Sequence, residues 1–267
     1  MISRTVPSAL AYRWSAGELT PAGSEASLDD GERLDAVDSF LVSDGRALAV
    51  GLHQQRFTNA VPEPARSSAD AFFSAAVAVV PPTGEWFPRV QYGIRSGFTV
   101  TVRPAPAVAR SIVLATHDGP DPRTQPTRKG PDLPALLAAR EMARGRGADD
   151  AVILSPAGFV VEGATTSLLW WRGDTLCTPS ADLVRMDGVT IGSVLALARA
   201  LGVEVSWESA TPADLDGLEV WALNSLHGIR IVTSWIDGPL TAEQPARLAL
   251  WRARLDKLTR PLATLTA

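Results

Sequence analysis

The chain has 267 residues, enough for one large domain or two of ordinary size with a substantial core. It is 46% hydrophobic and 20% charged with a net charge of −4, which favours neither nucleic acid nor an anionic membrane as a partner. The most apolar run, Ala71 to Val80, is too short to cross a bilayer. The single cysteine cannot form an internal disulfide, and residues 1–7 lack a secretory signal pattern, so we expect a cytoplasmic protein.

The first half of the chain predicts short strands and two helices. Residues 34–42 and 46–50 have the pattern of two strands joined by a turn at Ser43-Asp44-Gly45. Helices are expected at 52–60 and 67–79, because apolar residues recur there at helical spacing. Further strands are expected at 89–95, 98–102 and 111–115.

A proline-rich segment, residues 119–134, interrupts all periodicity and predicts a domain boundary. Asp132 is the expected N-cap of a helix over 133–144, which Gly145 or Gly147 ends. We therefore expect an N-terminal α+β domain over 1–118, an interdomain loop over 119–130 and a C-terminal α+β domain over 131–267.

The second half is richer in strands. Residues 151–154 and 159–171 predict a hairpin through the turn Ser155-Pro156-Ala157-Gly158. Strands are also expected at 175–177, 203–207 and 219–223, with helices at 188–201 and around Trp251 to Leu258. Because the helices intervene irregularly, the pattern indicates an α+β fold rather than a regular βαβ series.

Only two of the 25 basic residues are lysines, Lys129 and Lys257. Where arginine has replaced lysine almost everywhere, a remaining lysine is a candidate for chemistry that needs a deprotonated amine, such as imine formation. Lys257 falls on the polar face of the expected C-terminal helix, where a solvated charge is the simpler interpretation. Lys129 lies in the proline-rich loop without a salt-bridge pattern around it, so it is the candidate nucleophile.

Glu162 is a carboxylate within the otherwise apolar run Phe159 to Leu169. Strand alternation alone favours a solvent-facing glutamate. If the carboxylate is instead buried, it needs a cationic or hydrogen-bonding partner. One such partner is the protonated nitrogen of a bound heterocycle, which would make that ring a strong electron sink.

Two segments are candidates for holding a phosphate. Asp187-Gly188-Val189-Thr190 opens a helix whose first amides could bind an anion. Asn224-Ser225-Leu226-His227-Gly228 follows a strand and offers a hydroxyl and turn amides. Each segment also has an ordinary interpretation, as a helix cap and as a strand-end turn. The three histidines are far apart in the sequence, so we expect no metal site.

Taken in order, these motifs resemble the fold-type IV pyridoxal-phosphate enzymes, from about Leu34 to Val232. The motifs are His53-x-x-Arg56, Lys129-x-x-Asp132, Val161-Glu162-Gly163-x-x-Thr166-Ser167-Leu168, Gly188-Val189-Thr190 and Asn224-Ser225. The resemblance implies a two-domain α+β fold similar to D-amino-acid aminotransferase, with pyridoxal 5'-phosphate in the interdomain cleft. It further implies a homodimer that acts on a small-molecule amine.

Residue roles follow from the resemblance by position. Lys129 matches the lysine that bonds covalently to the cofactor and moves protons, and Glu162 matches the glutamate paired with the pyridine nitrogen. The phosphate-binding set is matched by Arg56, the amides of Val189 and Thr190, and Ser225. The residue types agree with this chemistry, since arginine and a helix N-terminus suit a dianion.

Departures from the family pattern bear on the substrate more than on the cofactor. Asp132 stands where the family usually has asparagine, Leu133 replaces the tyrosine of branched-chain enzymes, and Ile191 replaces an arginine. The N-terminal G-D-G-x-F-E signature is nearly unreadable, with Asp38-Ser39 in place of its last residues.

The Asn224-Ser225-x-x-Gly228 run is similar to that of aminodeoxychorismate lyases, where aminotransferases more often have Gly-Thr-Ala. We therefore expect a lyase that releases 4-aminobenzoate and pyruvate, an activity of folate biosynthesis. The alternative is an aminotransferase for D- or branched-chain amino acids, and the second alternative is a non-catalytic binding protein on the same fold. Arg95 and Asn224 are the candidate substrate contacts; Arg89, Tyr92 and Arg103 could also hold substrate carboxylates, or be ordinary strand residues.

Overall fold

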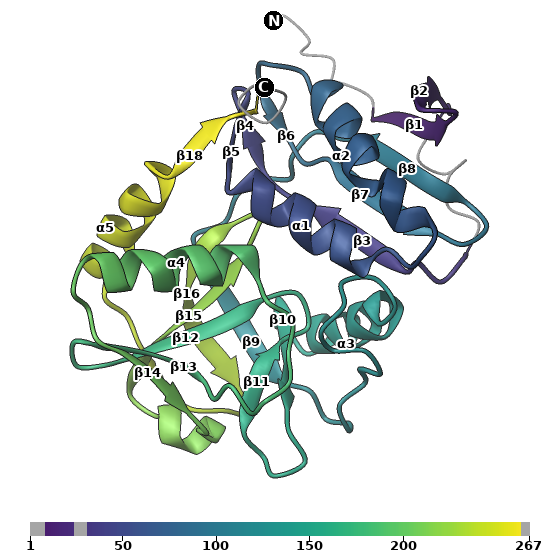
Figure 1. Cartoon of the computed structure of the whole chain (residues 1–267). Coiled ribbons are helices and arrows are strands. Elements are labelled where there is room, and N and C mark those ends of the chain that lie inside the picture. Colours follow the sequence, from purple (N-terminus) through teal and green to yellow (C-terminus); the bar gives the residue numbers. More distant parts are fainter. Residues whose placement is uncertain (1–8, 24–30, 263–267) are drawn as a thin grey trace, which may run out of the picture. The chain divides into compact units, whose positions relative to one another are not determined.

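The computed structural model describes residues 9–23 and 31–262 (Figure 1). Backbone contacts divide it into two units. Unit 1 contains the chain up to Val108, the segment Arg128–Pro131 and the residues from Leu258 onward. Unit 2 contains Ala109–Thr127 and Asp132–Lys257. Residues 1–7, from which we expect no secretory signal, lie outside the described residues.

Unit 1 is built on a five-stranded antiparallel sheet with two helices. Its strand order is β2 (Glu18–Pro21), β1 (Leu10–Ser15), β8 (Gly97–Val102), β7 (Arg89–Gly93) and β3 (Ala36–Ser39). Helix α1 (Val50–Ala60) packs on β3, and α2 (Ala69–Ala78), which follows a 3-10 turn at Ala65–Ser68, packs on β8. A second sheet has the order β18 (Thr259–Pro261), β5 (Arg46–Leu48), β4 (Val42–Ser43) and β6 (Glu85–Trp86).

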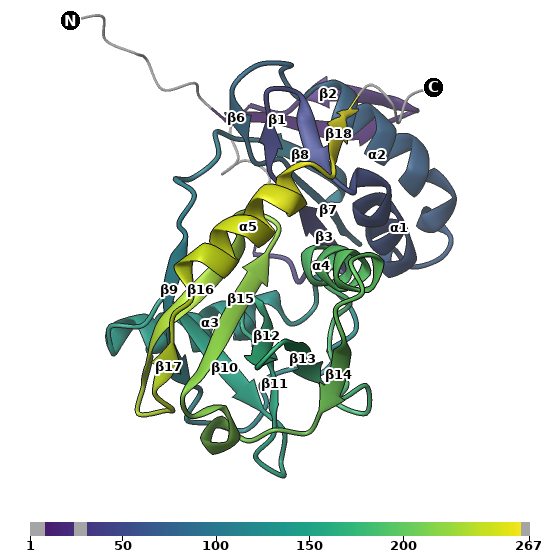
Figure 2. The same cartoon turned by 90° about the vertical axis from the view of Figure 1, so that its left-hand side faces the viewer.

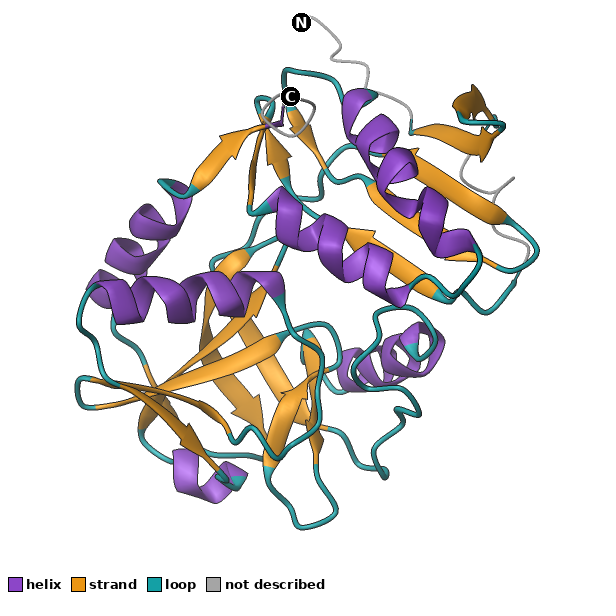
Figure 3. Ribbon diagram, viewed as in Figure 1, coloured by secondary structure: helices purple, strands orange, loops and turns teal. Residues whose placement is uncertain are grey.

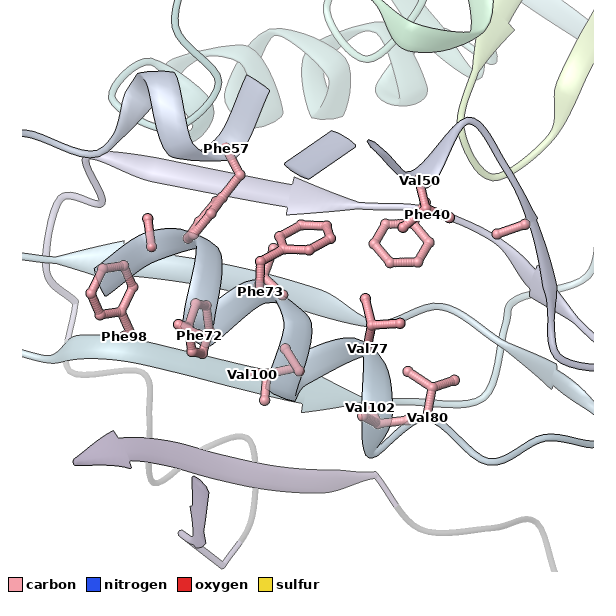
Figure 4. Packing of buried hydrophobic residues seen from close by; sticks show 14 of the residues in the cluster. Phe40, Val50, Phe57, Phe72, Phe73, Val77, Val80, Phe98, Val100 and Val102 are labelled. Atoms are coloured by element: carbon pink, nitrogen blue, oxygen red, sulfur yellow. The ribbon is translucent and has the colours of Figure 1, made fainter. Parts of the chain in front are cut away.

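Phenylalanine side chains from both helices meet those of the strands in the core of unit 1 (Figure 4). Phe72 stacks on Phe98 with ring centroids 4.9 Å apart, and Phe57 lies 6.0 Å from Phe73. Full burial of one such ring contributes roughly 1.5–3 kcal/mol, so these contacts hold α1 firmly against the unit. Because His53 and Phe57 lie on the same buried stripe of α1, the core also determines the orientation of the His53-x-x-Arg56 motif.

Unit 2 is one mixed sheet flanked by helices (Figures 2 and 3). Helices α3 (Leu133–Gly145), α4 (Val189–Ala200) and α5 (Pro245–Asp256) pack against β10, β15 and β16 respectively, and a 3-10 turn spans Pro212–Leu215. The strand order is β11 (Val160–Gly163), β10 (Asp150–Leu154), β9 (Ser111–Thr116), β16 (Gly228–Ile236), β15 (Leu218–Asn224), β12 (Ser167–Arg172), β13 (Thr175–Pro179) and β14 (Val205–Glu208), with β17 (Thr241–Ala242) beside β15.

The structure divides the chain at different residues from those predicted from the proline-rich segment. Strand β9 pairs in parallel with β10 and β16, so residues 109–118 pack with unit 2. Residues 128–131 pack with unit 1, where the Val37 amide donates to the Lys129 carbonyl at 2.7 Å. The C-terminus also returns to unit 1, because β18 pairs with β5. Pairing between strands far apart in the sequence therefore determines which residues belong to each unit. The proline content of a segment does not predict this.

Two local expectations are corrected. The strand predicted over 159–171 is two strands, because the chain turns between Gly163 and Ser167, where the Gly163 amide donates to the Thr166 carbonyl. The Asp132 side chain does not cap α3. Its carboxylate instead accepts hydrogen bonds from the Thr124 hydroxyl at 2.7 Å and from the Gln125 amide at 2.6 Å, which orders the loop before Lys129.

The sequence patterns missed strands β1, β2 and β16. The β16 segment contains Arg230 and follows a turn, which hides its apolar alternation. The helices at 52–60, 67–79, 133–144 and 188–201 are confirmed within a few residues.

Candidate active site

In unit 1, a buried carboxylate connects the two residues of the His53-x-x-Arg56 motif. Asp38 on β3 is 0% exposed and its Oδ1 accepts from His53 Nδ1 at 2.8 Å. Arg56 donates to both carboxylate oxygens, from Nε to Oδ2 and from Nη2 to Oδ1, each at 2.8 Å. This two-point contact fixes the plane of the Arg56 guanidinium. Since His53 Nδ1 donates to Asp38, the 3.3 Å approach of Arg56 Nη2 to the same nitrogen is a close contact and not a hydrogen bond.

The charges of this cluster compensate one another. Burial alone would raise the pKa of Asp38, but attraction from Arg56 and His53 outweighs it and holds that pKa well below its usual range. Burial lowers the pKa of His53 despite the neighbouring Asp38, and the positive charges of Arg56 and Lys129 act in the same direction. His53 is therefore neutral at pH 7, and Asp38 is the counter-ion of Arg56.

Lys129 is held beside this cluster by its backbone. Its carbonyl accepts from Val37, one residue before Asp38, and the next residue, Gly130, has φ +154°. A Cβ at Gly130 would lie 2.8 Å from the Asp35 carbonyl oxygen, so glycine lets the loop lie directly against β3. The Lys129 charge acts on His53, which places the candidate nucleophile in the same electrostatic environment as Arg56.

In unit 2, Glu162 is buried and paired, so the interpretation as a solvent-facing strand residue is wrong. It is 5% exposed on β11, all four residues of which are buried, and Arg123 Nη1 donates to its Oε1. Arg123 also donates to both oxygens of Asp121, from Nε at 2.8 Å and from Nη2 at 2.7 Å. Burial works against the charge of Arg123, but the two carboxylates outweigh it and raise its pKa. Arg123 thus fixes the position of Glu162 and forms an ion pair with it.

A second guanidinium lies in the electrostatic environment of Glu162. Arg185 donates to the carbonyls of Pro179, Ser180 and Leu183 at 2.7–3.0 Å, which orders the segment before α4. Burial lowers the pKa of Arg185, while Glu162 acts to raise it and Arg123 to lower it. The carboxylate therefore sits between two positive charges.

The N-terminus of α4 has the properties of an anion site. Its N-cap, Gly188, provides no side-chain cap, and a Cβ there would lie 2.7 Å from Ser167 Oγ. The Thr190 hydroxyl is buried and has no hydrogen-bond partner among the described residues. Uncapped amides and an unsatisfied hydroxyl at a helix N-terminus suit a phosphate.

The turn from β15 to β16 contains Asn224 and Ser225. Asn224 Oδ1 accepts from the amides of Leu226 and His227 at 3.2 and 2.9 Å, and its Nδ2 donates to the Thr165 carbonyl at 3.4 Å. These bonds shape the turn and connect it with the segment after Glu162. Ser225 is half-buried at the start of that turn.

The other carboxylate-binding candidates lie in unit 1. Arg95 is 64% exposed and pairs with Glu32, which also accepts from the backbone amides of Arg95 and Ser96. Arg103 donates to the Phe87 carbonyl at 3.2 Å and lies over the Phe87 ring. Their role in substrate binding stays a prediction.

These residues fit pyridoxal 5'-phosphate. An amine, a buried carboxylate paired with an arginine, and an anion site with an unsatisfied hydroxyl suit its aldehyde, ring nitrogen and phosphate. Arg56 and Lys129 belong to unit 1, whereas Glu162, Val189, Thr190 and Ser225 belong to unit 2.

Three supporting residues were missed by the sequence interpretation: Asp38, Arg123 and Arg185. For Asp38 a signal existed, because a carboxylate in the apolar run Ala36 to Phe40 needs a partner for the same reason as Glu162. Arg123 and Arg185 lie in loops without periodicity, and only the folded chain shows their partners.

Solved structures similar to this chain have the fold of fold-type IV pyridoxal-phosphate enzymes. A fold IV transaminase from Curtobacterium pusillum matches with a TM-score of 0.77 at 20% identity, over 92% of this chain and 97% of that one. A hypothetical aminotransferase from Mycobacterium tuberculosis, in a form bound to pyridoxal phosphate, matches with a TM-score of 0.74 at 23% identity, over 94% and 98% of the two chains.

The family model for amino-transferase class IV matches residues 35–235. The chain belongs to the class IV aminotransferase family and is a pyridoxal-phosphate-dependent enzyme. This confirms the resemblance, the α+β fold class and the cofactor inferred from the sequence. No helix in the described ranges is long and apolar enough to cross a membrane.

Curated relatives differ in their named reactions. A probable branched-chain-amino-acid aminotransferase from Rickettsia bellii is 33% identical over 72 residues, which is 27% of this chain and only 25% of the relative. A bifunctional aminodeoxychorismate lyase and D-amino acid transaminase from Mycobacterium tuberculosis is 28% identical over 225 residues, covering 71% of this chain and 77% of the relative.

Proposed function

We propose that the protein is a 4-amino-4-deoxychorismate lyase that releases 4-aminobenzoate and pyruvate. The observation that carries this proposal is the turn sequence Asn224-Ser225-x-x-Gly228 at the end of β15. It is supported by the similarity to the bifunctional lyase and transaminase, which extends over most of both chains, whereas the branched-chain relative given above matches a short segment. We further propose a cytoplasmic homodimer.

When bound, the cofactor supplies a carbonyl that captures the substrate amine and a ring that accepts electrons. Lys129 then removes the proton from the substrate carbon that bears nitrogen. The enolpyruvyl group leaves the substrate with its oxygen and takes up a proton to become pyruvate. The six-membered ring of the substrate thereby becomes aromatic without any other reactant. Glu162, paired with Arg123, would keep the ring nitrogen of the cofactor protonated. Arg56, fixed by Asp38, and the N-terminus of α4 hold the phosphate.

The second candidate is an aminotransferase for D- or branched-chain amino acids. The named transaminase activity of the Mycobacterium tuberculosis relative favours it, and so do the branched-chain relatives. In that reaction Lys129 returns the proton to the cofactor carbon instead of promoting loss of a side chain.

The test is a product assay on aminodeoxychorismate with and without a keto-acid acceptor. A lyase turns over repeatedly without an acceptor, because its products carry away both parts of the substrate. A transaminase stops after one turnover until a keto acid is added. Absence of 4-aminobenzoate, together with acceptor-dependent conversion of D- or branched-chain amino acids, would establish the second candidate in place of the first.

A further inference from the structure

Arg230 on β16 is a buried cation without a hydrogen-bond partner at its Nε. Its exposed fraction is 4%, and within the described part of the chain no acceptor lies within reach of that atom and no carboxylate forms an ion pair with the guanidinium. Guanidinium groups have five donors and are costly to bury unpaired. A structural arginine in this setting would be expected to satisfy its donors with nearby carbonyls or carboxylates.

The neighbouring Arg252 shows that this part of the fold can satisfy an arginine. Its Nη1 donates to the carbonyl of His227 at 2.9 Å and to that of Ile229. Arg230 lies one residue after Ile229, yet it uses none of these acceptors. The difference indicates that the Arg230 guanidinium is oriented for something other than support of the backbone.

Strand register places Arg230 close to the turn between β15 and β16 that contains the candidate residues Asn224 and Ser225. Ala222 pairs with Arg230 and Asn224 pairs with Gly228, so Arg230 emerges on the same sheet face as Asn224. The turn that joins β15 to β16 also contains Ser225. Figure 2 shows β15 and β16 side by side along this hairpin.

The environment of this turn is positive. Burial lowers the pKa of His227 to about 4, with repulsion from Arg230, Arg140 and Arg252 acting in the same direction. Burial also lowers the pKa of Arg230 to about 10, although Asp150 and Asp149 attract it. Asp150 is itself 0% exposed with one oxygen, Oδ1, that has no partner among the described residues, and its other oxygen accepts from Thr166 Oγ1 at 2.8 Å.

We propose that Arg230 binds a carboxylate of the substrate beside the turn that contains Ser225. The inference rests on the proposed function and adds a specificity-determining residue to it. A guanidinium forms two parallel hydrogen bonds with a carboxylate, and such a pair in a buried place discriminates strongly against a neutral analogue. Aminodeoxychorismate and amino acids both carry carboxylates, so Arg230 serves either reaction.

The test compares 4-aminobenzoate with 4-aminobenzamide, which has the same shape without the charge. Binding to the holoenzyme is followed through tryptophan fluorescence and the cofactor absorbance. The wild-type protein should bind the acid about tenfold or more tightly than the amide, and Arg230→Met should bring this ratio close to one. Cofactor affinity should be unchanged in that variant.

Arg252→Met is the matched control, because it removes a guanidinium of α5 that contacts the same hairpin and donates to its carbonyls. It should lower the melting temperature while keeping the preference for the acid. Arg230→Met should melt at the same temperature as the wild type or higher, since an unpaired buried charge is removed. Arg230→Lys should keep part of the preference, because it restores charge without the two-point geometry.

A wild-type protein that does not distinguish acid from amide overturns the inference, as does an Arg230→Met variant that keeps the full preference. Loss of stability in Arg230→Met with an unchanged ratio would assign Arg230 to a structural network with Asp150, and this also overturns it. If the acid preference depends on Arg230 but no 4-aminobenzoate is formed from aminodeoxychorismate, the lyase proposal fails while the carboxylate site stands.

Discussion

The two units each contain a buried pair of arginine and carboxylate, and the pairs are used in opposite ways. In unit 1 the carboxylate, Asp38, is the support, and it fixes Arg56, the residue proposed to bind phosphate. In unit 2 the arginine, Arg123, is the support, and it fixes Glu162, the residue proposed to act on the cofactor ring. A buried ion pair does not by itself reveal which partner is functional; the other contacts of each partner do.

Unit 1 also provides Lys129, whose loss should have the largest effect on the reaction. Lys129→Ala should lower turnover by about a thousandfold or more, because no other described lysine lies in unit 1. Lys129→Arg should be equally inactive, since a guanidinium remains protonated. Lys257→Ala is the control and should keep activity. Turnover and the cofactor absorbance are the measurements, and full activity in either Lys129 variant contradicts the proposed role.

Replacing Asp38, which fixes Arg56 in unit 1, should reduce both the stability of the protein and its affinity for the cofactor. Asp38→Asn leaves Arg56 without its buried counter-ion, which costs about 3–5 kcal/mol of unfolding free energy. Denaturant unfolding and a cofactor titration measure the two effects. Asp44→Asn, at an exposed turn, is the control. If Asp38→Asn binds the cofactor as the wild type does, Asp38 does not position Arg56.

Replacing Glu162, the carboxylate of unit 2, should affect the rate of the reaction rather than cofactor binding, in contrast to replacing Asp38. Glu162→Gln should keep the fold and the bound cofactor, yet lose roughly a hundredfold in rate, since the ring nitrogen is no longer held protonated. Rate and bound cofactor are measured on the same sample. A variant with wild-type turnover would show that Glu162 is only a partner of Arg123.

Replacing Arg123, which holds Glu162 in position, should have a smaller effect on the rate. Arg123→Lys keeps a charge near Glu162 but loses the two-point contact with Asp121, so the rate should fall by about tenfold. The pH dependence of the cofactor absorbance should shift at the same time, because Glu162 loses the guanidinium that pairs with it. Arg144→Lys on the exposed face of α3 is the control. An unchanged absorbance profile would assign Arg123 to the loop alone.

The smallest predicted effect concerns His227, whose Nδ1 accepts from the Ala109 amide at 3.1 Å, in contrast to His53, whose Nδ1 meets a carboxylate. Its folded pKa of about 4 lies below the ordinary histidine pKa of 6.5, so the unfolded chain binds the extra proton first. The stability contribution of neutral His227 is therefore complete above pH 6.5 and is lost as the pH falls towards 4. His227→Asn should flatten the unfolding free energy across that window. An unchanged slope would show that other groups cause it.

The candidate residues of the site could be selected from the sequence. Lys129 stands out because arginine replaces lysine elsewhere, and Glu162 because a carboxylate in an apolar strand requires a partner. The helices of the phosphate-binding motifs, α1 and α4, follow from apolar spacing of three and four residues, which is a local property.

Contacts between residues far apart in the sequence determined the division into units and the partners of the site residues, which the sequence patterns did not predict. Strand β9 joined unit 2 because its edges pair with β10 and β16, and Lys129 joined unit 1 because its carbonyl binds the Val37 amide. Asp38 meets Arg56, and Arg123 meets Glu162, across 18 and 39 residues of chain. Spacing in a sequence reports the period of one helix or strand, whereas these contacts depend on which elements bury their apolar faces together, and that is decided only when the whole chain packs.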